Sequence, residues 1–120
     1  MKVLLIHQGP IHKAVHLGTV RSAIIQGGYT HDVVDGVPHA LCMLPHDDYR
    51  VIILDCTTRP ELAPELTRRL TSEMRLMTRE PFLVLITDQI IENSNGLEVT
   101  CVSADHFGIA TISSLLKVYE

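Results

Sequence analysis

The sequence predicts an α/β fold in which a doubly wound, five-stranded parallel sheet is covered by helices on both faces. Two apolar runs, 51–54 and 82–86, show no polar alternation, which is typical of strands buried on both faces. Segments with apolar residues three or four positions apart separate the strand-like runs, as crossover helices do. The 120 residues, 46% of them hydrophobic, suffice for a single domain spanning 1–120.

The first strand and helix follow from the start of the chain. Residues 2–7 form an apolar run that ends at Gly9-Pro10, which predicts a buried strand. Pro10 suits the first turn of a helix, and Gly27-Gly28 ends that helix. The apolar residues expected on its buried face are Ala14, Leu17, Val20 and Ile24.

The next two elements are short. Residues 30–35 carry polar side chains at most positions, which predicts a strand at the edge of the sheet. Residues 38–44 allow about two turns of helix before Pro45. Its apolar side consists of Ala40, Leu41 and Leu44. The central strand 51–54 follows and ends at Asp55.

A longer helix is expected to begin at Pro64 and to end at Pro81. Its inward face steps by four, four and three residues through Leu66, Leu70, Met74 and Met77. Residues 82–86 then predict the fourth strand.

The end of the chain holds a last strand and a last helix. Residues 88–97 leave room for one helical turn and a loop, so a fourth helix is expected to be shortened. Residues 97–103 predict the fifth strand, and Asp105 can cap the final helix. The buried stripe expected on that helix is Ile109, Ile112, Leu116 and Tyr119. The predicted strand order is 2-1-3-4-5.

Composition excludes several classes of function. The net charge is −4 and only ten residues are Lys or Arg, so the chain has no basic surface for nucleic acid or anionic membranes. Three cysteines without CxxC spacing favour reduced, mostly buried thiols in a cytoplasmic protein over a disulfide framework or zinc site. The first apolar run is too short for an export signal, and no membrane segment is expected.

Polar residues gather where the predicted strands end. Because the carboxyl ends of parallel strands meet at one edge, that edge is expected to hold His7, Gln8, Asp55, Thr87, Asp88 and Ser103. Asp55 has two interpretations there. It is either a structural loop residue or a functional carboxylate presented by a rigid strand.

Residues 28–36, 40–44 and 49–55 resemble a known family. They follow its pattern of glycine-tyrosine, second strand, short helix, and third strand ending in aspartate. On these segments the whole chain resembles the receiver domains of bacterial two-component response regulators, which implies a flavodoxin-like fold. The resemblance implies that Asp55 is the position that a histidine kinase phosphorylates.

The resemblance also implies parts that this sequence lacks. The family holds Mg²⁺ with an acidic pair after the first strand, and those positions here are His7 and Gln8. Neither supplies the anionic oxygens that Mg²⁺ prefers. The family's lysine after the fifth strand has no counterpart. Thr87 is the candidate for the switch hydroxyl, although it lies one residue later than expected.

The predicted function is therefore a receiver-like, or pseudo-receiver, regulatory module that is not an enzyme. It is expected to act through protein partners without Mg²⁺ and without any other cofactor. The alternative is a single-domain response regulator in a phosphorelay, phosphorylated at Asp55 by a histidine kinase, with Mg²⁺ held by Asp88, Asp105 or Asp32. A further alternative is the receiver of a longer transcription regulator.

Other groups of residues in the sequence suggest different functions. His12 and His16 have the i, i+4 spacing of a metal pair near His7, which suggests a metal or small-molecule sensor, although a solvated pair is favoured. Cys56 beside Asp55 is interpreted as a core thiol rather than a redox-sensitive one. A nucleotide site is disfavoured because the loop after the first strand has one glycine and a proline.

The final helix predicts a homodimer contact. Receivers commonly pair through their fourth helix, fifth strand and fifth helix, and a shortened fourth helix would uncover apolar area there. The candidate contact residues are Phe107, Leu115, Val118 and Tyr119, next to Ile90 and Ile91.

Overall fold

The computed structural model describes residues 1–9, 16–87, 99–103 and 108–120. Five parallel strands form one sheet in the order β2-β1-β3-β4-β5, which confirms the predicted fold class and strand order. The strands are β1 (Lys2–His7), β2 (Thr30–Asp35), β3 (Val51–Asp55), β4 (Phe82–Ile86) and β5 (Val99–Val102).

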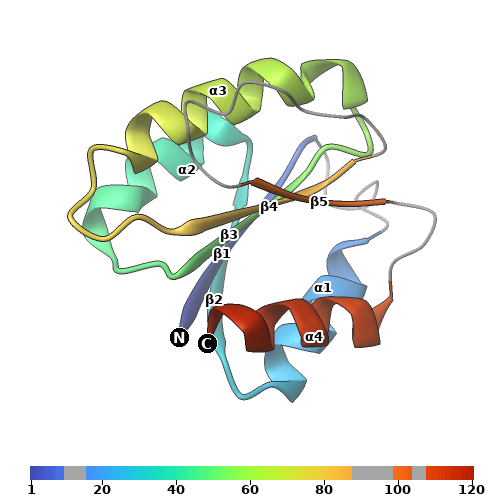
Figure 1. The fold of residues 1–120 in the computed structure, drawn as a ribbon. Coiled ribbons are helices and arrows are strands. Elements are labelled where there is room, and N and C mark those ends of the chain that lie inside the picture. The colour runs from blue at the N-terminus through green and yellow to red at the C-terminus, as the bar shows by residue number, and fades with distance from the viewer. Residues whose placement is uncertain (10–15, 88–98, 104–107) are drawn as a thin grey trace.

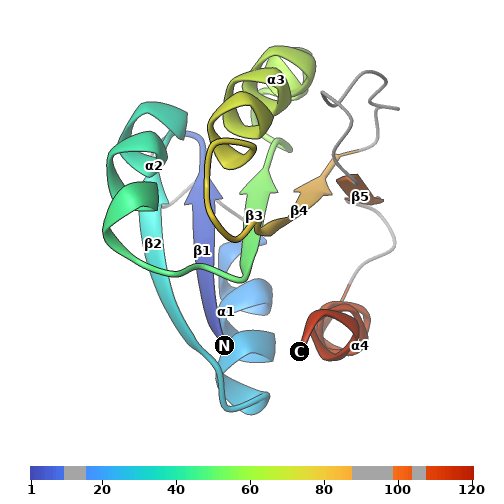
Figure 2. The same ribbon diagram turned by 60° about the vertical axis from the view of Figure 1, so that its left-hand side comes forward.

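Helices cover both faces of the sheet. Figures 1 and 2 show α2 and α3 on one face and α1 and α4 on the other, as right-handed crossovers require. The helices are α1 (Leu17–Gln26), α2 (Val37–Met43), α3 (Ala63–Met74) and α4 (Ile109–Tyr119). Short 3₁₀ turns η2 (Leu44–His46) and η3 (Pro60–Leu62) follow α2 and precede α3. No helix in the described ranges is long and apolar enough to cross a membrane.

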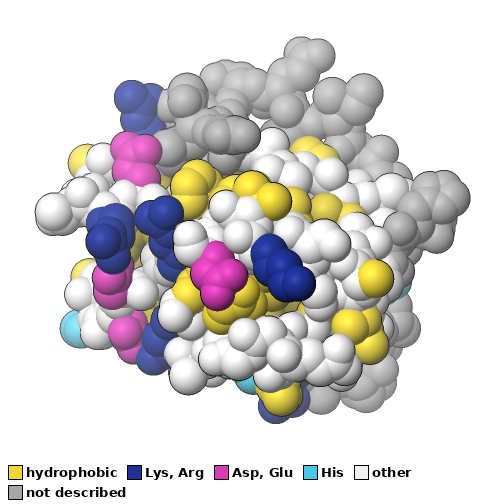
Figure 3. All heavy atoms as spheres, turned by 60° about the horizontal axis from the view of Figure 1, so that its bottom comes forward, with side chains coloured by type: hydrophobic (Ala, Val, Ile, Leu, Met, Phe, Trp, Pro, Cys, Tyr) yellow, Lys and Arg dark blue, Asp and Glu magenta, His cyan; other side chains and the backbone are white. Residues whose placement is uncertain are grey.

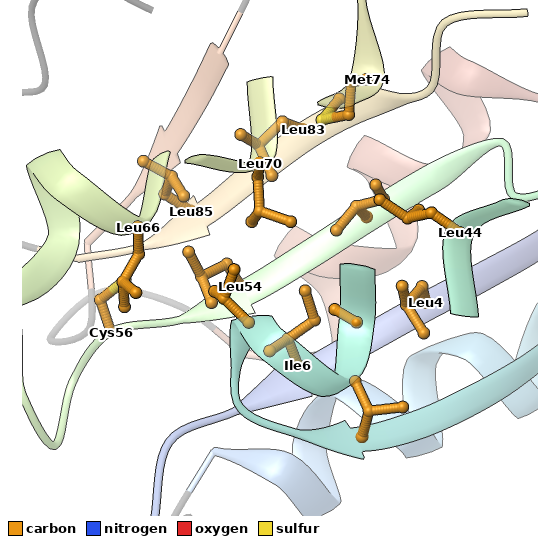
Figure 4. Packing of buried hydrophobic residues seen from close by; sticks show 14 of the residues in the cluster. Leu4, Ile6, Leu44, Leu54, Cys56, Leu66, Leu70, Met74, Leu83 and Leu85 are labelled. Atoms are coloured by element: carbon orange, nitrogen blue, oxygen red, sulfur yellow. The ribbon is translucent and has the colours of Figure 1, made fainter. Parts of the chain in front are cut away.

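Two apolar cores lie on either side of the sheet. The first joins the sheet to α2 and α3, and Figure 4 shows Leu66, Leu70 and Met74 of α3 lying over side chains of β3 and β4. The second joins the sheet to α1 and α4. Each residue of β3 is buried, because the strand lies between β1 and β4 and beneath helices on both faces. This central strand fixes the position of Asp55.

Helix α3 is shorter than the sequence predicts. It begins one residue before Pro64, close to the prediction, but it ends at Met74 rather than near Pro81. A helix of about 12 residues rises ~18 Å, close to the length of a five-residue strand. The chain must then return to the start of β4, where the Phe82 N–H donates to the Arg50 carbonyl at 2.9 Å. Met77 therefore lies in the turn after α3, although it still packs against the core.

Other boundaries differ by smaller amounts. The chain does not leave its helical path at Pro45, because η2 carries this proline in its first turn, where no backbone N–H is needed. Ile109, expected in the buried stripe of the last helix, is 39% exposed. It lies in the first turn of α4, and Ile112 is the first residue of that helix to be buried.

Several predicted features lie outside the described residues. They are the beginning of the first helix up to Ala14, the shortened fourth helix within 88–97, the first residues of the range 97–103, and the Asp105 cap. The N-cap of α4 as described is Gly108.

Candidate functional site

The carboxyl edge of the sheet carries three nearly buried polar side chains. His7 ends β1, Asp55 ends β3, and Thr87 directly follows β4. Their exposed fractions are 4%, 4% and 3%. Asp55 lies opposite Ile86 in the sheet register, so Thr87 is one residue beyond the neighbour of Asp55. The topology thus brings His7, Asp55 and Thr87 to one edge, whereas Asp88, also predicted there, lies outside the described residues.

Asp55 is held by a local turn. Its Oδ1 accepts hydrogen bonds from the Thr57 backbone N–H at 2.9 Å and from the Thr57 hydroxyl at 2.6 Å. An aspartate that accepts the N–H two residues ahead is a common turn device. Sequence reasoning missed Thr57, although the Asp-Cys-Thr spacing carries this signal. The two bonds fix the carboxylate at the end of the strand.

The loop after β1 is tied to the loop after β3. The Thr58 hydroxyl donates to the Gln8 carbonyl at 3.0 Å. Gly9 has a φ of +85°, in the left-handed region that favours glycine, and its N–H donates to Asp35 Oδ1 at 3.2 Å. These bonds bring Gln8 next to the segment that begins at Asp55.

Two buried nitrogen atoms beside this edge have no hydrogen-bond partner among the described residues. They are His7 Nδ1 and Gln8 Nε2. His7 Nδ1 lies 3.9 Å from Asp35 Oδ1, which is too far for a hydrogen bond. An unpaired buried polar group costs free energy, so its presence at a strand end marks a site of interest.

These residues do not fit a magnesium ion. Mg²⁺ takes carboxylate oxygens and water in octahedral geometry, whereas His7 and Gln8 contribute an imidazole and a neutral amide. Among the described residues, no group of three or more His, Cys, Asp or Glu side chains is placed to hold a metal. Asp55 supplies a carboxylate at the end of β3, and Asp35 at the end of β2 is bound by the Gly9 N–H, but the end of β1 supplies none.

Asp32 is not available to replace the missing acidic pair, which corrects one of the alternatives above. Its carboxylate accepts a hydrogen bond from the Tyr49 hydroxyl at 2.5 Å and lies 3.2 Å from the Lys2 ammonium. The Tyr49 bond, more than the nearby lysine, lowers the pKa of Asp32. Its partners Lys2 and Tyr49 begin β1 and precede β3, so Asp32 serves the amino end of the sheet rather than the edge that carries Asp55. Asp88 and Asp105 lie outside the described residues.

Cys56 is a core residue. It is fully buried, and burial, assisted by the charge of Asp55, raises the pKa of the thiol to about 12. A thiol with so high a pKa and no exposure is a poor nucleophile at neutral pH. The other thiols, Cys42 and Cys101, are exposed, so the prediction that the cysteines are mostly buried is wrong for these two.

The histidine pair is only partly described. His16 is the N-cap of α1, and His12 lies outside the described residues. The structure therefore does not place the two histidines on one helical face.

The predicted dimer residues have different environments. Val118 is 76% exposed, Leu115 is half-buried, and Phe107 lies outside the described residues. The prediction that Tyr119 is a dimer-contact residue on the surface is wrong. It is 8% exposed, its ring stacks on Phe82 with centroids 4.4 Å apart, and its hydroxyl is 2.6 Å from the Thr100 hydroxyl.

The side of the molecule that carries α1 and α4 has apolar and charged side chains intermingled, as Figure 3 shows. Ile25 of α1 and Val118 of α4 are its largely exposed aliphatic residues among those described.

Comparison with solved structures identifies the fold. A response regulator receiver domain protein from Bacillus halodurans C-125 matches with a TM-score of 0.74 and 13% identity, over 100% of this chain and 97% of that chain. An orphan response regulator of H. pylori matches with a TM-score of 0.71 and 13% identity, over 99% and 95%.

A third match is an atypical orphan response regulator described as having a phosphorylation-independent regulatory mechanism. Its TM-score is 0.69 and its identity 13%, over 99% of this chain and 94% of that one. The sequence matches no protein-family model and no curated protein. The chain thus has the fold of a response-regulator receiver domain along its whole length.

Proposed function

We propose that this chain is a receiver-like regulatory module that works through protein contacts and without Mg²⁺-dependent phosphorylation. The observation that carries the proposal is the chemistry of the residues after β1. A buried imidazole, His7, and a half-buried amide, Gln8, stand where phosphoryl transfer to Asp55 needs anionic oxygens for a metal. In this proposal the module is cytoplasmic and has no catalytic activity of its own.

The physical argument concerns charge. Transfer of a phosphoryl group to a carboxylate brings two negative species together, and a metal or a lysine normally offsets their repulsion. The imidazole of His7 and the amide of Gln8 supply no anionic oxygen to hold such a metal. Phosphorylation of Asp55 would also disrupt the compact turn in which the backbone N–H and the hydroxyl of Thr57 donate hydrogen bonds to the carboxylate.

The similarity to an orphan regulator described as phosphorylation-independent supports the same proposal. That description belongs to the other protein, whose sequence is 13% identical. A protein of this fold is thus described as regulating independently of phosphorylation, as we propose for this chain.

Intact-mass spectrometry after incubation with acetyl phosphate and Mg²⁺ tests the proposal. The expected result is an unchanged mass, because the site lacks a metal-binding pair, while a conventional receiver treated in parallel gains one phosphate. A gain of one phosphate in this protein that disappears in Asp55→Ala would overturn the proposal.

The second candidate function is a phosphorelay regulator that a histidine kinase phosphorylates at Asp55, either alone or as part of a longer transcription regulator. The observation that favours it is the position of Asp55, buried at the end of the central strand with Thr87 following the next strand. In that case Asp88 would supply the carboxylate for Mg²⁺.

We also propose self-association through α4. Val118 is the residue of this helix that supports the idea best, because a valine that is 76% exposed gains from burial against a second copy. Leu115, one turn earlier and half-buried, extends the same side of the helix.

A further inference from the structure

A groove of about 560 Å³ opens at the amino end of the sheet, on the side of α2 and α3. It lies where the turn after α2 and the end of α3 meet, at the left of Figure 1, away from the edge that carries Asp55. All residues that line it are described. They are Leu41, Leu44, Pro45, Asp47, Asp48, Glu73, Leu76, Met77, Thr78 and Arg79.

The groove exists because α3 ends early. Backbone bonds from Leu76 N–H to Glu73 O and from Met77 N–H to Met74 O, each 3.1 Å, tighten the last turn and lead the chain away from the helix axis. The apolar part of the lining follows from this turn. Leu44 is buried, Met77 is half-buried, and Leu76 is left 80% exposed.

An exposed leucine alone means little, because folded proteins carry many. Leu76 differs in its surroundings, since it borders a groove whose other apolar members, Leu41 and Met77, already pack on the core. An apolar side chain that enters the groove would contact this lining and cover Leu76 as well.

The polar part of the lining is acidic. Asp47, Asp48 and Glu73 supply three carboxylates to the lining, against the guanidinium of Arg79, and Asp47 is also ion-paired with Lys2, which lies outside the lining. Asp48 and Arg79 form an ion pair at 3.2 Å, but each side chain is 67% exposed, and such a pair contributes little stability. Glu73 has no ion-pair partner among the described residues. The rim thus leaves negative charge for a cationic partner.

We infer that this groove binds a basic amphipathic helix of a partner protein. Its apolar face would cover Leu76 and enter between Leu41 and Met77, while its Lys or Arg residues would meet Glu73 and Asp48. A helix suits the site because the walls are helices and turns and offer no sheet edge to an added strand. A small molecule suits it less, since exposed residues such as Pro45 and Asp48 line the groove and would not enclose it.

The inference gives the proposed module a contact surface that is separate from Asp55. It rests on the proposed function only in assuming that the protein works through protein contacts. Phosphorylation of Asp55 would overturn the proposed function without affecting the groove, and failure of the groove would leave the argument about Asp55 unchanged. The two failures are therefore distinguishable.

The test uses a designed peptide of about 18 residues with leucine on one helical face and lysine on the other, long enough to form helix on binding. Amide shifts of the ¹⁵N-labelled protein are followed during titration. Saturable shifts are expected at Leu41, Leu76, Met77 and Thr78, with weaker binding at higher salt. The same peptide with glutamate in place of lysine is expected to bind at least tenfold more weakly.

Two exposed positions supply matched variants. Leu76→Asp is expected to weaken peptide binding about tenfold or more, because it removes the apolar contact. Glu73→Lys is expected to weaken it roughly fivefold, because it removes the carboxylate that meets the peptide lysines. Ile25→Asp changes an aliphatic residue that is 61% exposed on the opposite face and is expected to bind as the wild type does. Circular dichroism checks that each variant is folded.

Three results would overturn the inference. Equal affinity for the lysine and glutamate peptides would remove its electrostatic basis. No saturable shift in the groove up to about 1 mM peptide, which corresponds to only weak binding, would remove the site itself. Groove shifts that grow with protein concentration alone would make a second copy the occupant instead of a basic partner.

Discussion

Replacing Tyr119 with alanine is expected to lower the free energy of unfolding by about 3 kcal/mol, as truncation of a buried aromatic side chain generally does. The ring fills the space between α4 and the sheet and stacks on Phe82. Its backbone carbonyl also accepts a hydrogen bond from Arg50 Nε at 3.1 Å, which ties the end of the helix to the start of β3. Urea denaturation followed by circular dichroism measures the change.

Two further variants separate the contribution of the Tyr119 ring from that of its hydroxyl and of the neighbouring residue. Tyr119→Phe removes only the hydroxyl near Thr100 and is expected to cost about 1 kcal/mol. Val118→Asp alters a side chain that is 76% exposed, so its stability should change by at most about 0.5 kcal/mol. In sedimentation, the same variant is expected to be monomeric at concentrations at which the wild type associates.

A Tyr119→Ala protein that unfolds within about 1 kcal/mol of the wild type would contradict the core assignment. A Val118→Asp protein that still associates would place the self-contact elsewhere on the surface.

Introducing two carboxylates with His7→Asp and Gln8→Asp is expected to destabilise the metal-free protein by about 3 kcal/mol. The new charges would lie at a strand end that is 4% exposed at position 7, near Asp35 and in the loop tied to the segment of Asp55. Like charges held together in a partly dehydrated site repel strongly.

Magnesium is expected to reverse much of this loss in the double variant. An ion that binds the folded state alone stabilises it by mass action, about 2.7 kcal/mol at a hundredfold excess over its dissociation constant. Urea denaturation with and without about 10 mM Mg²⁺, against about 10 mM Na⁺, measures the effect. Wild-type stability is expected to be the same with either salt.

The isosteric variant His7→Asn with Gln8→Asn is the matched control, because it changes size in a similar way but adds no charge. If Mg²⁺ stabilises this control or the wild type as much as it stabilises the double variant, the account of the missing acidic pair is wrong.

The fold was predictable because the sequence signals it locally. The uninterrupted apolar run of β3 is expected only of a strand buried on both faces, and the structure buries it completely. The stripe of Leu66, Leu70 and Met74 likewise identified the inward face of α3. The length of that helix was not predictable from its stripe, because the return to the start of β4 ends it.

The site was predictable only in part. Strand ends placed Asp55, His7 and Thr87 at one edge, since topology alone decides this. The turn that fixes Asp55 through Thr57 is a polar contact that hydrophobic periodicity does not report. Tyr119 was assigned to both the buried stripe and the surface patch, and only the contacts with Phe82 and Thr100 decide between them.

The groove beside Leu76 could not be predicted from the sequence at all. It depends on where α3 ends and on how the turn after α2 approaches it, and neither follows from a local pattern. The apolar stripe predicts a helix that continues through Met77, and such a helix would leave no turn at Leu76 to border the groove.

Titration of the wild-type protein with Mg²⁺ and beryllofluoride, followed by amide chemical shifts, tests the central claim most directly. Beryllofluoride mimics a phosphoryl group and needs the metal to bind a carboxylate of this kind. The account predicts no saturable shift at Asp55, Thr57 or Thr87 below about 1 mM Mg²⁺, since His7 and Gln8 at the end of β1 supply an imidazole and an amide in place of two carboxylates. A saturable shift at these residues that disappears in Asp55→Ala would contradict it.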